Sequence, residues 1–523
     1  MKFLLSPRRF FSSVALALLA LVPGVRAQTA APAVLYTFQY TYYDVYVSPI
    51  GALVQDPAGN FYGTTQGGGT YGYGSVYRVT AAGAFTTLYS FTGGGDGSTP
   101  SGALLLYTDG RLYGTTFDGG SFGFGTVFSL TTGGSLTTLH GFDRADGRSP
   151  RSGLAAGTDG NLYGTTVGGG AYNTGTVFAI TPAGTLTTLH SFLRGEGTAP
   201  QASLVRGADG FFYGTTAFNG STDSRTDGPG GVFRISPAGD FQTLHLFNGP
   251  SEGYGAVAGL VQGGDGAFYG VNPDGGANGS GTIFRVTASG AFQVIYTFSA
   301  SGYGYNSDGI APLGTLLDGG DGRFYGSANL GGTNGTGTVF SVTPAGAFTT
   351  LYNFSSLDRD DTNTEGANPY AGFVRGLDGR LYAPISAGGA SDDGTVVAFT
   401  LGSTQASFFA GQVALSNGVY YLSFANGNFF GYYAYLSDPR YIYHFDLGYE
   451  YVFNAADGQG GVYLYDFKSG HFFYTSPTFG FPYLYDFTRK AVLYYYPNAT
   501  VPGHYTTNPR YFYDFGTGTI ITQ

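Results

Sequence analysis

The chain has 523 residues, with 91 Gly, 44 Tyr and 45 Phe but only 11% charged residues. This length exceeds one ordinary domain core, and glycine-rich turns with aromatic residues are typical of strands, so the composition predicts an all-β fold. No cysteine occurs, which excludes disulfides, thiol nucleophiles and thiolate metal sites.

The first residues have the pattern of a secretory signal peptide. Lys2, Arg8 and Arg9 form a basic start, an apolar stretch covers residues 12–22, and Val25-Arg26-Ala27 is a small-x-small cleavage site. We therefore expect residues 1–27 to be a signal peptide and the protein to be exported, with an extracellular, periplasmic or cell-surface localisation. The general secretory route is favoured, and the Arg8-Arg9 pair leaves twin-arginine export as the alternative.

Removal of residues 1–27 takes away four basic residues and no acidic ones, which leaves 19 basic against 33 acidic residues and a net charge of −14. Such a surface repels phosphate backbones and anionic lipids, so we expect no nucleic-acid partner. A neutral polysaccharide or another surface protein fits this charge better. No later stretch approaches the ~20 apolar residues of a membrane-spanning helix, so no transmembrane anchor is expected after the leader.

One sequence pattern recurs seven times between residues 34 and 403. Each copy has four short β-prone runs separated by turn signals, and neighbouring copies lie 50 to 57 residues apart. Its central aromatic-small step occurs at Tyr62-Gly63, Tyr113-Gly114, Tyr163-Gly164, Tyr213-Gly214, Tyr269-Gly270, Tyr325-Gly326 and Tyr382-Ala383. A period near 50 with four strands predicts one propeller blade per copy.

The fourth run, Leu-aromatic-x-Phe in most copies, is missing after the seventh copy, but Leu35-Tyr36-Thr37-Phe38 precedes the first. We therefore predict a seven-bladed β-propeller over residues 28–403, closed by its own N-terminal strand, with an open solenoid as the main alternative.

Two kinds of connection join the predicted strands. Tight turns, such as the Asp-Gly steps, follow the first and third strands and must share one rim of the ring. The long connections, which include residues 117–125, 217–231, 298–312 and 355–370, must then lie on the other rim. Binding residues are found disproportionately on loops of a rigid scaffold, so that rim is the predicted binding face.

The segments DGNLYGTT, GTVF and PAGTLTTLHSF, read between residues 159 and 192, resemble the repeat of the choice-of-anchor tandem repeat GloVer-containing proteins. The resemblance extends over most of residues 34–403. It implies an exported bacterial repeat protein with a separate C-terminal attachment segment, and it implies no activity and no catalytic residues.

Residues 404–523 differ in character, with 20 Tyr and 15 Phe in 120 positions. A Tyr-x-Tyr-x-Phe pattern begins at Tyr441, Tyr463, Tyr483 and Tyr511, at spacings that suit successive hairpins. We predict a smaller aromatic-rich antiparallel β-domain here. Its rings are interpreted first as the domain core and alternatively as a platform for glycans.

Few residues suggest chemistry. His140, His190 and His245 occupy a repeat position that is Tyr89, Tyr296 and Tyr352 in other copies, which predicts aromatic packing over catalysis or metal binding. The densest acidic run, Asp358, Asp360, Asp361 and Glu365, lacks the bend glycine of a calcium loop and is interpreted as a solvated loop. The glycine-rich connections precede strands and carry no lysine, so they do not fit phosphate binding.

The sequence therefore supplies no catalytic, cofactor-binding or metal-binding residue, and we expect no cofactor. It favours an exported, non-catalytic binding or cell-surface scaffold protein, possible ligands being glycans or envelope components. The alternative is a polysaccharide-acting hydrolase or lyase, which a close carboxylate pair in the mouth of the ring would support. Catalysis is thus left open, with a non-enzyme favoured.

Overall fold

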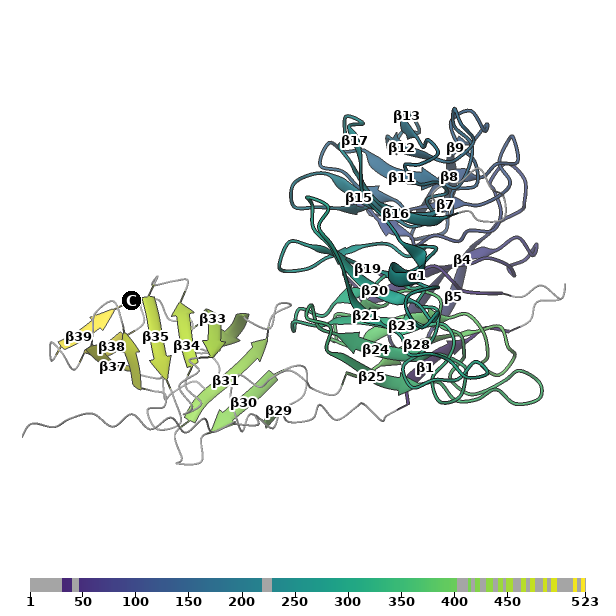
Figure 1. Cartoon of the computed structure of the whole chain (residues 1–523). Helices are drawn as coiled ribbons and strands as arrows, with labels where there is room; N and C mark the ends of the chain where they lie inside the picture. Colours follow the sequence, from purple (N-terminus) through teal and green to yellow (C-terminus); the bar gives the residue numbers. More distant parts are fainter. Residues whose placement is uncertain are drawn as a thin grey trace, which may run out of the picture.

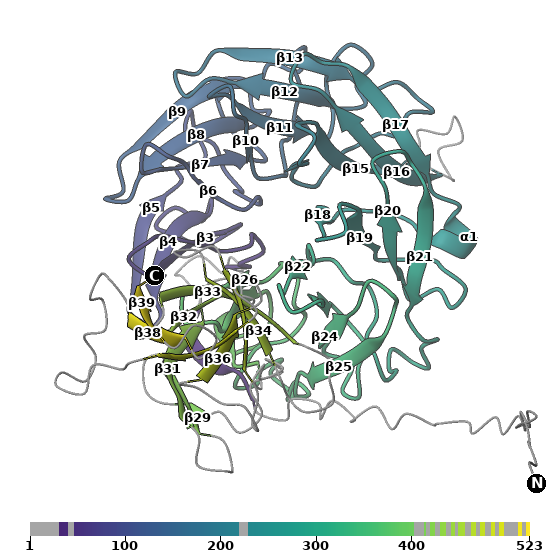
Figure 2. The same ribbon diagram turned by 90° about the vertical axis from the view of Figure 1, so that its left-hand side faces the viewer.

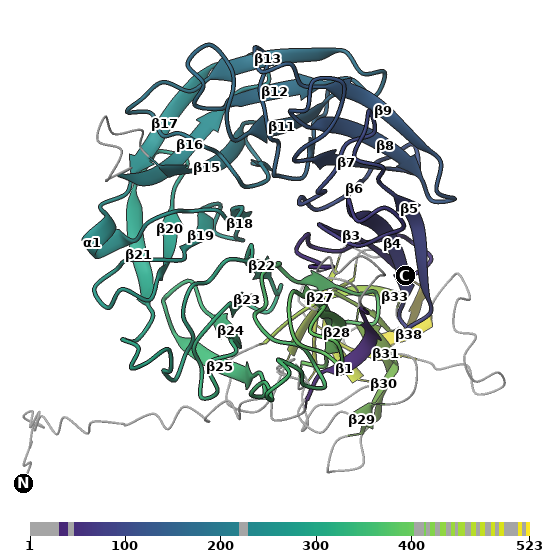
Figure 3. The same cartoon turned by 90° about the vertical axis from the view of Figure 1, so that its right-hand side faces the viewer.

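The computed structural model describes residues 31–39, 47–218 and 228–401, and beyond residue 412 the backbone of separate strands. Seven four-stranded antiparallel sheets stand around a common axis as the blades of a propeller (Figures 2 and 3). The predicted all-β class and the blade count are therefore confirmed. The predicted signal peptide, residues 1–27, lies outside the described residues.

Each blade corresponds to one repeat copy, and its first strand is only two residues long. Blades one to three are β2 (Val54–Gln55), β3 (Asn60–Thr65), β4 (Ser75–Thr80) and β5 (Phe85–Ser90); β6 (Leu105–Leu106), β7 (Arg111–Thr116), β8 (Thr126–Thr131) and β9 (Leu136–Gly141); β10 (Ala155–Ala156), β11 (Leu162–Thr166), β12 (Thr176–Ile180) and β13 (Leu186–Ser191). Blades four to six are β14 (Val205–Arg206), β15 (Phe212–Phe218), β16 (Pro229–Ile235) and β17 (Phe241–Leu246); β18 (Val261–Gln262), β19 (Phe268–Asn272), β20 (Thr282–Val286) and β21 (Phe292–Thr297); β22 (Leu317–Asp318), β23 (Phe324–Ala328), β24 (Thr338–Val342) and β25 (Phe348–Asn353).

The seventh blade combines the two ends of the repeat region. It contains β26 (Val374–Arg375), β27 (Leu381–Ile385) and β28 (Thr395–Phe399), and its outer strand is β1 (Ala33–Thr37). β1 pairs antiparallel with β28, from Ala33 opposite Ala398 to Thr37 opposite Thr395. The proposal that the N-terminal strand closes the ring, made below, rests on this pairing.

Apolar side chains fill the space between neighbouring blades, in seven clusters that each join one blade to the next. At the first junction, Tyr62 and Phe91 of blade one pack with Leu112 and Phe128 of blade two, and all four are at most 1% exposed. Burying one such side chain contributes about 1.5–3 kcal/mol. Because both faces of a blade are covered only by its neighbours, the stability of each blade depends on the ring.

The small residue of each aromatic-small step has a steric cause. A Cβ added at Gly114 would lie 2.6 Å from Cζ of Phe128 on the neighbouring strand, and the corresponding glycines of the next four blades meet a phenylalanine in the same way. Both positions differ in blade seven, where Ala383 stands in place of the glycine and faces Val397 in place of the phenylalanine.

The threonines after this step bond in two directions. The hydroxyl of Thr115 donates to the carbonyl of Ser152 in the next blade at 2.7 Å, whereas Thr116 bonds Thr126 within its own blade at 2.9 Å. Within four residues, the recurring Tyr-Gly-Thr-Thr segment therefore supplies a buried aromatic ring, a glycine against which a neighbouring ring can pack, and a hydrogen bond between blades.

The two rims of the ring differ as the sequence predicts. Tight turns join first to second and third to fourth strands, whereas the connections after the second and fourth strands lie together on the opposite rim. Isolated bridges pair a connection after a fourth strand with a connection after a second strand of the next blade, as between Ser98 and Asp118 and between Tyr254 and Asp274. We call this side the long-connection rim. It also carries α1 (Gly249–Glu252), the only helix among the described residues (Figure 1).

After residue 412 the described strands form one antiparallel sheet in chain order. They are β29 (Val413–Ala414), β30 (Val419–Ser423), β31 (Phe429–Tyr435), β32 (Tyr441–His444), β33 (Gly448–Asn454), β34 (Val462–Asp466), β35 (His471–Thr475), β36 (Tyr483–Asp486), β37 (Ala491–Tyr495), β38 (Tyr511–Asp514) and β39 (Thr519–Thr522). The four Tyr-x-Tyr segments occupy alternate strands, β32 to β38. A separate aromatic β-domain over residues 404–523 stays a prediction.

Candidate functional site

Exposed aromatic side chains gather on the long-connection rim. Eight aromatic residues in the described part of the chain are more than a third exposed, and all lie in its connections or at the strand end that leads into one. They are Tyr71, Tyr73, Phe122, Tyr172, Phe218, Tyr254, Tyr303 and Tyr305. We call this set the aromatic rim. Their restriction to one rim makes these residues candidates for contact with a ligand.

Several of these rings lie against glycine backbone. A Cβ at Gly93 would come within 2.8 Å of the Tyr73 ring, and one at Gly335 within 3.1 Å of the Tyr305 ring. The two tyrosines are nevertheless 49% and 53% exposed. One side of each ring is thus supported by the protein while the rest is open to solvent, which is the arrangement that a stacking partner needs.

Six carboxylates fasten the connections of this rim to the outer strands. Each accepts a bond from the aromatic residue of a fourth strand and from a backbone N–H of its own connection. The pairs are Tyr89–Asp96 at 3.0 Å, His140–Asp146 at 2.6 Å, His190–Glu196 at 2.9 Å, His245–Glu252 at 2.8 Å, Tyr296–Asp308 at 2.6 Å and Tyr352–Glu365 at 3.0 Å. The connections that follow the fourth strands, which carry Tyr254, Tyr303 and Tyr305 of the aromatic rim, are therefore held in place.

The predicted packing role of the histidines is confirmed. The His190 ring stacks on Phe241 of the next blade with centroids 3.9 Å apart, and His245 stacks on Phe292 at 4.0 Å. Their carboxylate partners were missed, although an Asp or Glu follows the aromatic position within 6 to 13 residues in each copy. That spacing varies too much to be recognised without the fold.

The hydrogen bonds between fourth strands and connections also shift the pKa values of the paired groups. Burial and the hydrogen bond to Asp96 raise the pKa of Tyr89 to about 12. Burial also acts to raise the pKa of Asp96, but the hydrogen bonds from Thr92 and Tyr89 outweigh it, so the pKa of that carboxyl is lowered.

The acidic run at residues 358–365 lies in the connection between β25 and β26 and stabilises that connection. Asp358 accepts bonds from the backbone N–H groups of Asp360 and Thr362, whereas Glu365 is 5% exposed and accepts bonds from Tyr352 and Ser355. The interpretation as a solvated loop was therefore wrong for Glu365, because that residue is the buried carboxylate of its blade. Within the described ranges, no three His, Asp or Glu side chains are placed to hold a metal ion.

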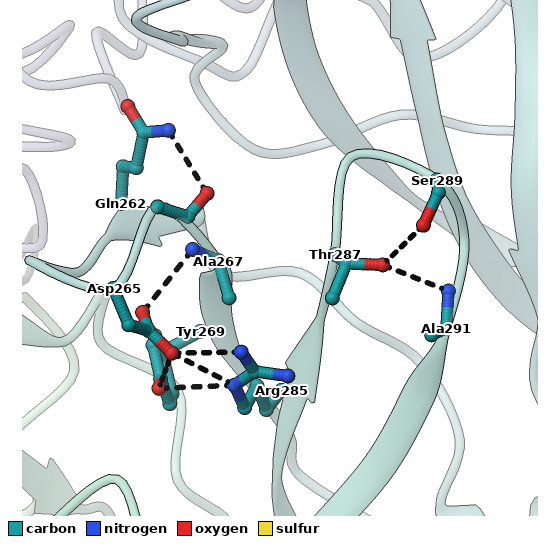
Figure 4. A network of polar contacts seen from close by, with 9 residues as sticks. Gln262, Asp265, Ala267, Tyr269, Arg285, Thr287, Ser289 and Ala291 are labelled. Atoms are coloured by element: carbon teal, nitrogen blue, oxygen red, sulfur yellow. Dashed lines mark hydrogen bonds and ion pairs between the residues drawn. The ribbon is translucent and has the colours of Figure 1, made fainter.

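On the opposite rim, every blade has a tyrosine whose hydroxyl donates to an aspartate of the tight turn. Figure 4 shows one of these pairs, in which Tyr269 and Arg285 both bind Asp265, at 2.9 Å and 2.8 Å. The seven distances lie between 2.6 and 2.9 Å. In this turn the glycine takes the positive φ, 77° at Gly266, while the aspartate anchors the tyrosine.

The central channel opens on the long-connection rim through a cavity of ≈ 100 Å³, lined by three consecutive residues from each blade. The first residue of each triplet follows a proline in six blades. These seven residues, which we call the channel mouth, are Ile50, Ser101, Arg151, Gln201, Val257, Leu313 and Tyr370.

Arg151 is the only charged residue among those that line this cavity. Its two terminal nitrogens donate to Oε1 of Gln201 at 3.1 Å and to the Tyr370 hydroxyl at 3.4 Å. The lining residues include no Asp or Glu, so the carboxylate pair that would support a hydrolase or lyase is not among them. Sequence analysis missed Arg151, although it is the one charged residue at this repeat position.

The fold and the regular blade contacts define a β-propeller repeat protein. The chain also matches the model of the Gloeobacter/Verrucomicrobia repeat over residues 24–226 and 204–438, and it belongs to that family. This confirms the resemblance recognised in the sequence. Within the described residues, no helix has the length and apolar character needed to cross a bilayer.

Solved structures with similar folds are known at low identity. A periplasmic gluconolactonase of Pseudomonas aeruginosa is 19% identical, with a TM-score of 0.42 over 59% of this chain and 85% of its own. A gluconolactonase of Xanthomonas campestris is 13% identical, with a TM-score of 0.37 over 68% of this chain and 96% of its own. None of the curated proteins matches the chain. These likenesses carry no inference about ligand or activity.

Proposed function

We propose that this chain is an exported, non-catalytic binding protein that holds a neutral polysaccharide on the aromatic rim. The observation that carries the proposal is that all eight exposed aromatic residues of the described chain lie on the long-connection rim. Aromatic rings with a hydroxyl edge offer both an apolar face for a sugar ring and a hydrogen-bonding group. The acidic surface disfavours polyanions as the polymer bound there.

Ring closure is part of the same proposal. β1 supplies the outer strand of blade seven, and Tyr36 stacks on Phe85 of blade one with centroids 3.8 Å apart. A ring whose ends are paired keeps the rim loops of neighbouring blades at fixed separations. A rigid platform loses less conformational entropy when it binds an extended ligand.

A glycan-array screen of the protein lacking residues 1–27 tests the proposal, with release of reducing ends measured on every hit. We expect binding without release, and binding that survives high salt, because screening weakens charge pairs but not stacking. The Tyr73→Ala/Phe122→Ala/Tyr172→Ala variant should lose most of this binding.

Leu377→Ala provides the matched control, because Leu377 is 73% exposed but lies in a tight turn on the opposite rim. Binding that is lost in moderate salt would point to a cationic protein partner instead. Release of reducing ends would support the polysaccharide-acting enzyme, and equal losses in the rim and control variants would contradict the assignment of the ligand to the aromatic rim.

A further inference from the structure

We propose that the channel mouth is a binding site for a carboxylate group, held by Arg151, Gln201 and Tyr370. This site is separate from the aromatic rim and does not depend on the function proposed above. Three features of the mouth favour such a ligand: its charge, the direction of its hydrogen bonds and the fixed backbone that carries it.

The charge of the mouth is uncompensated. Arg151 is half-buried, both of its hydrogen-bond partners are neutral, and no carboxylate lines the cavity. Arg285 and Arg380 each pair with the aspartate of their own blade, whereas Arg111, Arg234 and Arg323 also bond neutral groups. Arg151 differs from all of these because it lines the central cavity. A guanidinium that is withdrawn from water without a counter-ion is unfavourable, and a bound anion would relieve that cost. The planar guanidinium suits a carboxylate in particular, because two parallel bonds can form.

The hydrogen bonds leave several donors available to a ligand. Gln201 accepts from Arg151 through its oxygen, so its amide nitrogen keeps two hydrogens, and the Tyr370 hydroxyl accepts from Arg151 and keeps its own hydrogen. A ligand at the mouth would therefore meet the N–H groups of Arg151 and Gln201 and the O–H of Tyr370. Three donors of this kind complement an anion and not a cation.

The backbone that carries these side chains is held in a conformation that the repeat shares. In six blades a non-glycine residue with positive φ and then a proline precede the mouth residue, and in the three blades of the site the φ is 54° at Ser149, 53° at Ala199 and 57° at Asn368. The N–H of Ser149 donates to Phe124 of the preceding blade, and its carbonyl accepts from the N–H of Val167. The repeated backbone therefore fixes where the mouth residues start, and the differences in side chain among the blades set what the mouth can bind.

The size of the cavity and the apolar residues in its lining define the ligand class. A cavity of ≈ 100 Å³ admits a carboxylate and only a few further atoms, and Ile50, Val257 and Leu313 make part of its lining apolar. The shared chemistry is thus a terminal carboxylate on a short carbon skeleton, which either a sugar acid or a small organic acid can supply. The other atoms of a sugar acid would lie outside the cavity on the rim.

Glucuronate and glucose form the discriminating pair, because they differ only in the carboxylate at C6. Calorimetric titration at pH 7 of the full chain lacking residues 1–27 should give at least tenfold tighter binding of glucuronate. Arg151→Gln should abolish this preference, and Tyr370→Phe should weaken it several-fold. The control is Arg206→Gln, which removes the same charge from an exposed position on the opposite rim and should leave the preference intact.

Acetate distinguishes the two sources: binding as tight as that of glucuronate would assign the site to small organic acids, and weaker binding would assign it to sugar acids. Equal binding of glucose and glucuronate, or equal losses in Arg151→Gln and Arg206→Gln, would overturn the proposal. Thermal unfolding of each variant checks that the fold is intact. Failure of the aromatic rim to bind a neutral polymer would leave these results unchanged.

Discussion

In blade seven, one position has a larger residue than in the other blades and the position opposite has a smaller one, and each can be mutated back to the residue found in the other blades. In five blades a glycine faces a phenylalanine ring whose Cζ lies 2.5–2.6 Å from the place of a Cβ. Blade seven has Ala383 and Val397 at these positions, 1% and 0% exposed, and Phe373 where the other blades have leucine. We predict that Val397→Phe and Ala383→Gly each destabilise the protein but partly correct each other.

The expected energies follow from packing. Val397→Phe places a ring against the Ala383 methyl, and overpacking of this kind costs about 1–3 kcal/mol. Ala383→Gly removes a buried methyl and adds backbone freedom, which together cost about 1–2 kcal/mol. In the double variant the ring occupies the space that the methyl leaves, so its stability should exceed the additive expectation by about 1–2 kcal/mol. Adding Phe373→Leu should increase the recovery.

Equilibrium unfolding in urea, followed by the near-ultraviolet circular dichroism of tyrosine, measures these differences as midpoint shifts at constant slope. Ala383→Gly combined with Val127→Phe in blade two is the control, because residues in separate blade junctions should act additively. If the blade-seven double variant were also additive, the steric explanation of the Tyr-Gly step would be refuted.

Three further predictions concern the ring as a whole. Deleting residues 28–40 should lower the thermal midpoint because β28 loses its partner, whereas deleting residues 404–523 should leave it nearly unchanged; the reverse order would contradict ring closure. Tyr113→Phe should cost about 1 kcal/mol in urea unfolding because it removes the bond from the Tyr113 hydroxyl to Asp109, and Tyr305→Phe at the exposed rim should cost almost nothing. Burial and the bonds to aspartate raise the pKa of Tyr62, Tyr113, Tyr163 and Tyr213 to about 12. The stability that these residues contribute is therefore complete below pH about 10 and is lost as the pH rises towards 12. Spectrophotometric titration at 295 nm should show that they ionise late and together with unfolding, and early ionisation without unfolding would refute this.

Much of the fold could be predicted because its causes are local and repeated. Tyr163, Gly164 and the turn at Asp159 recur with their spacing in every blade with little change, and seven copies of a four-strand unit leave few ways to cover both faces of each sheet. The same regularity predicted which connections share a rim and identified the His190 position as an aromatic packing position.

The candidate sites could not be predicted in the same way, because they depend on where the copies differ. Nothing in the sequence distinguishes Phe122, which is 62% exposed, from Phe124, which lies two residues further along the same connection but packs against a blade junction. Glu365 was interpreted as part of a solvated acidic run, because its neighbours in the sequence are acidic and its partner Tyr352 is identified only by the fold.

Periodic turn and aromatic residues specify the strand content, the number of blades and the rim on which the long connections lie. Which side chains share a surface depends on the fold. Arg151 and Tyr370 are separated by 219 positions, yet their side chains meet because the ring brings one residue of every blade to the same axis. The channel mouth and the aromatic rim are therefore properties of the ring of seven blades, because no single repeat contains either of them.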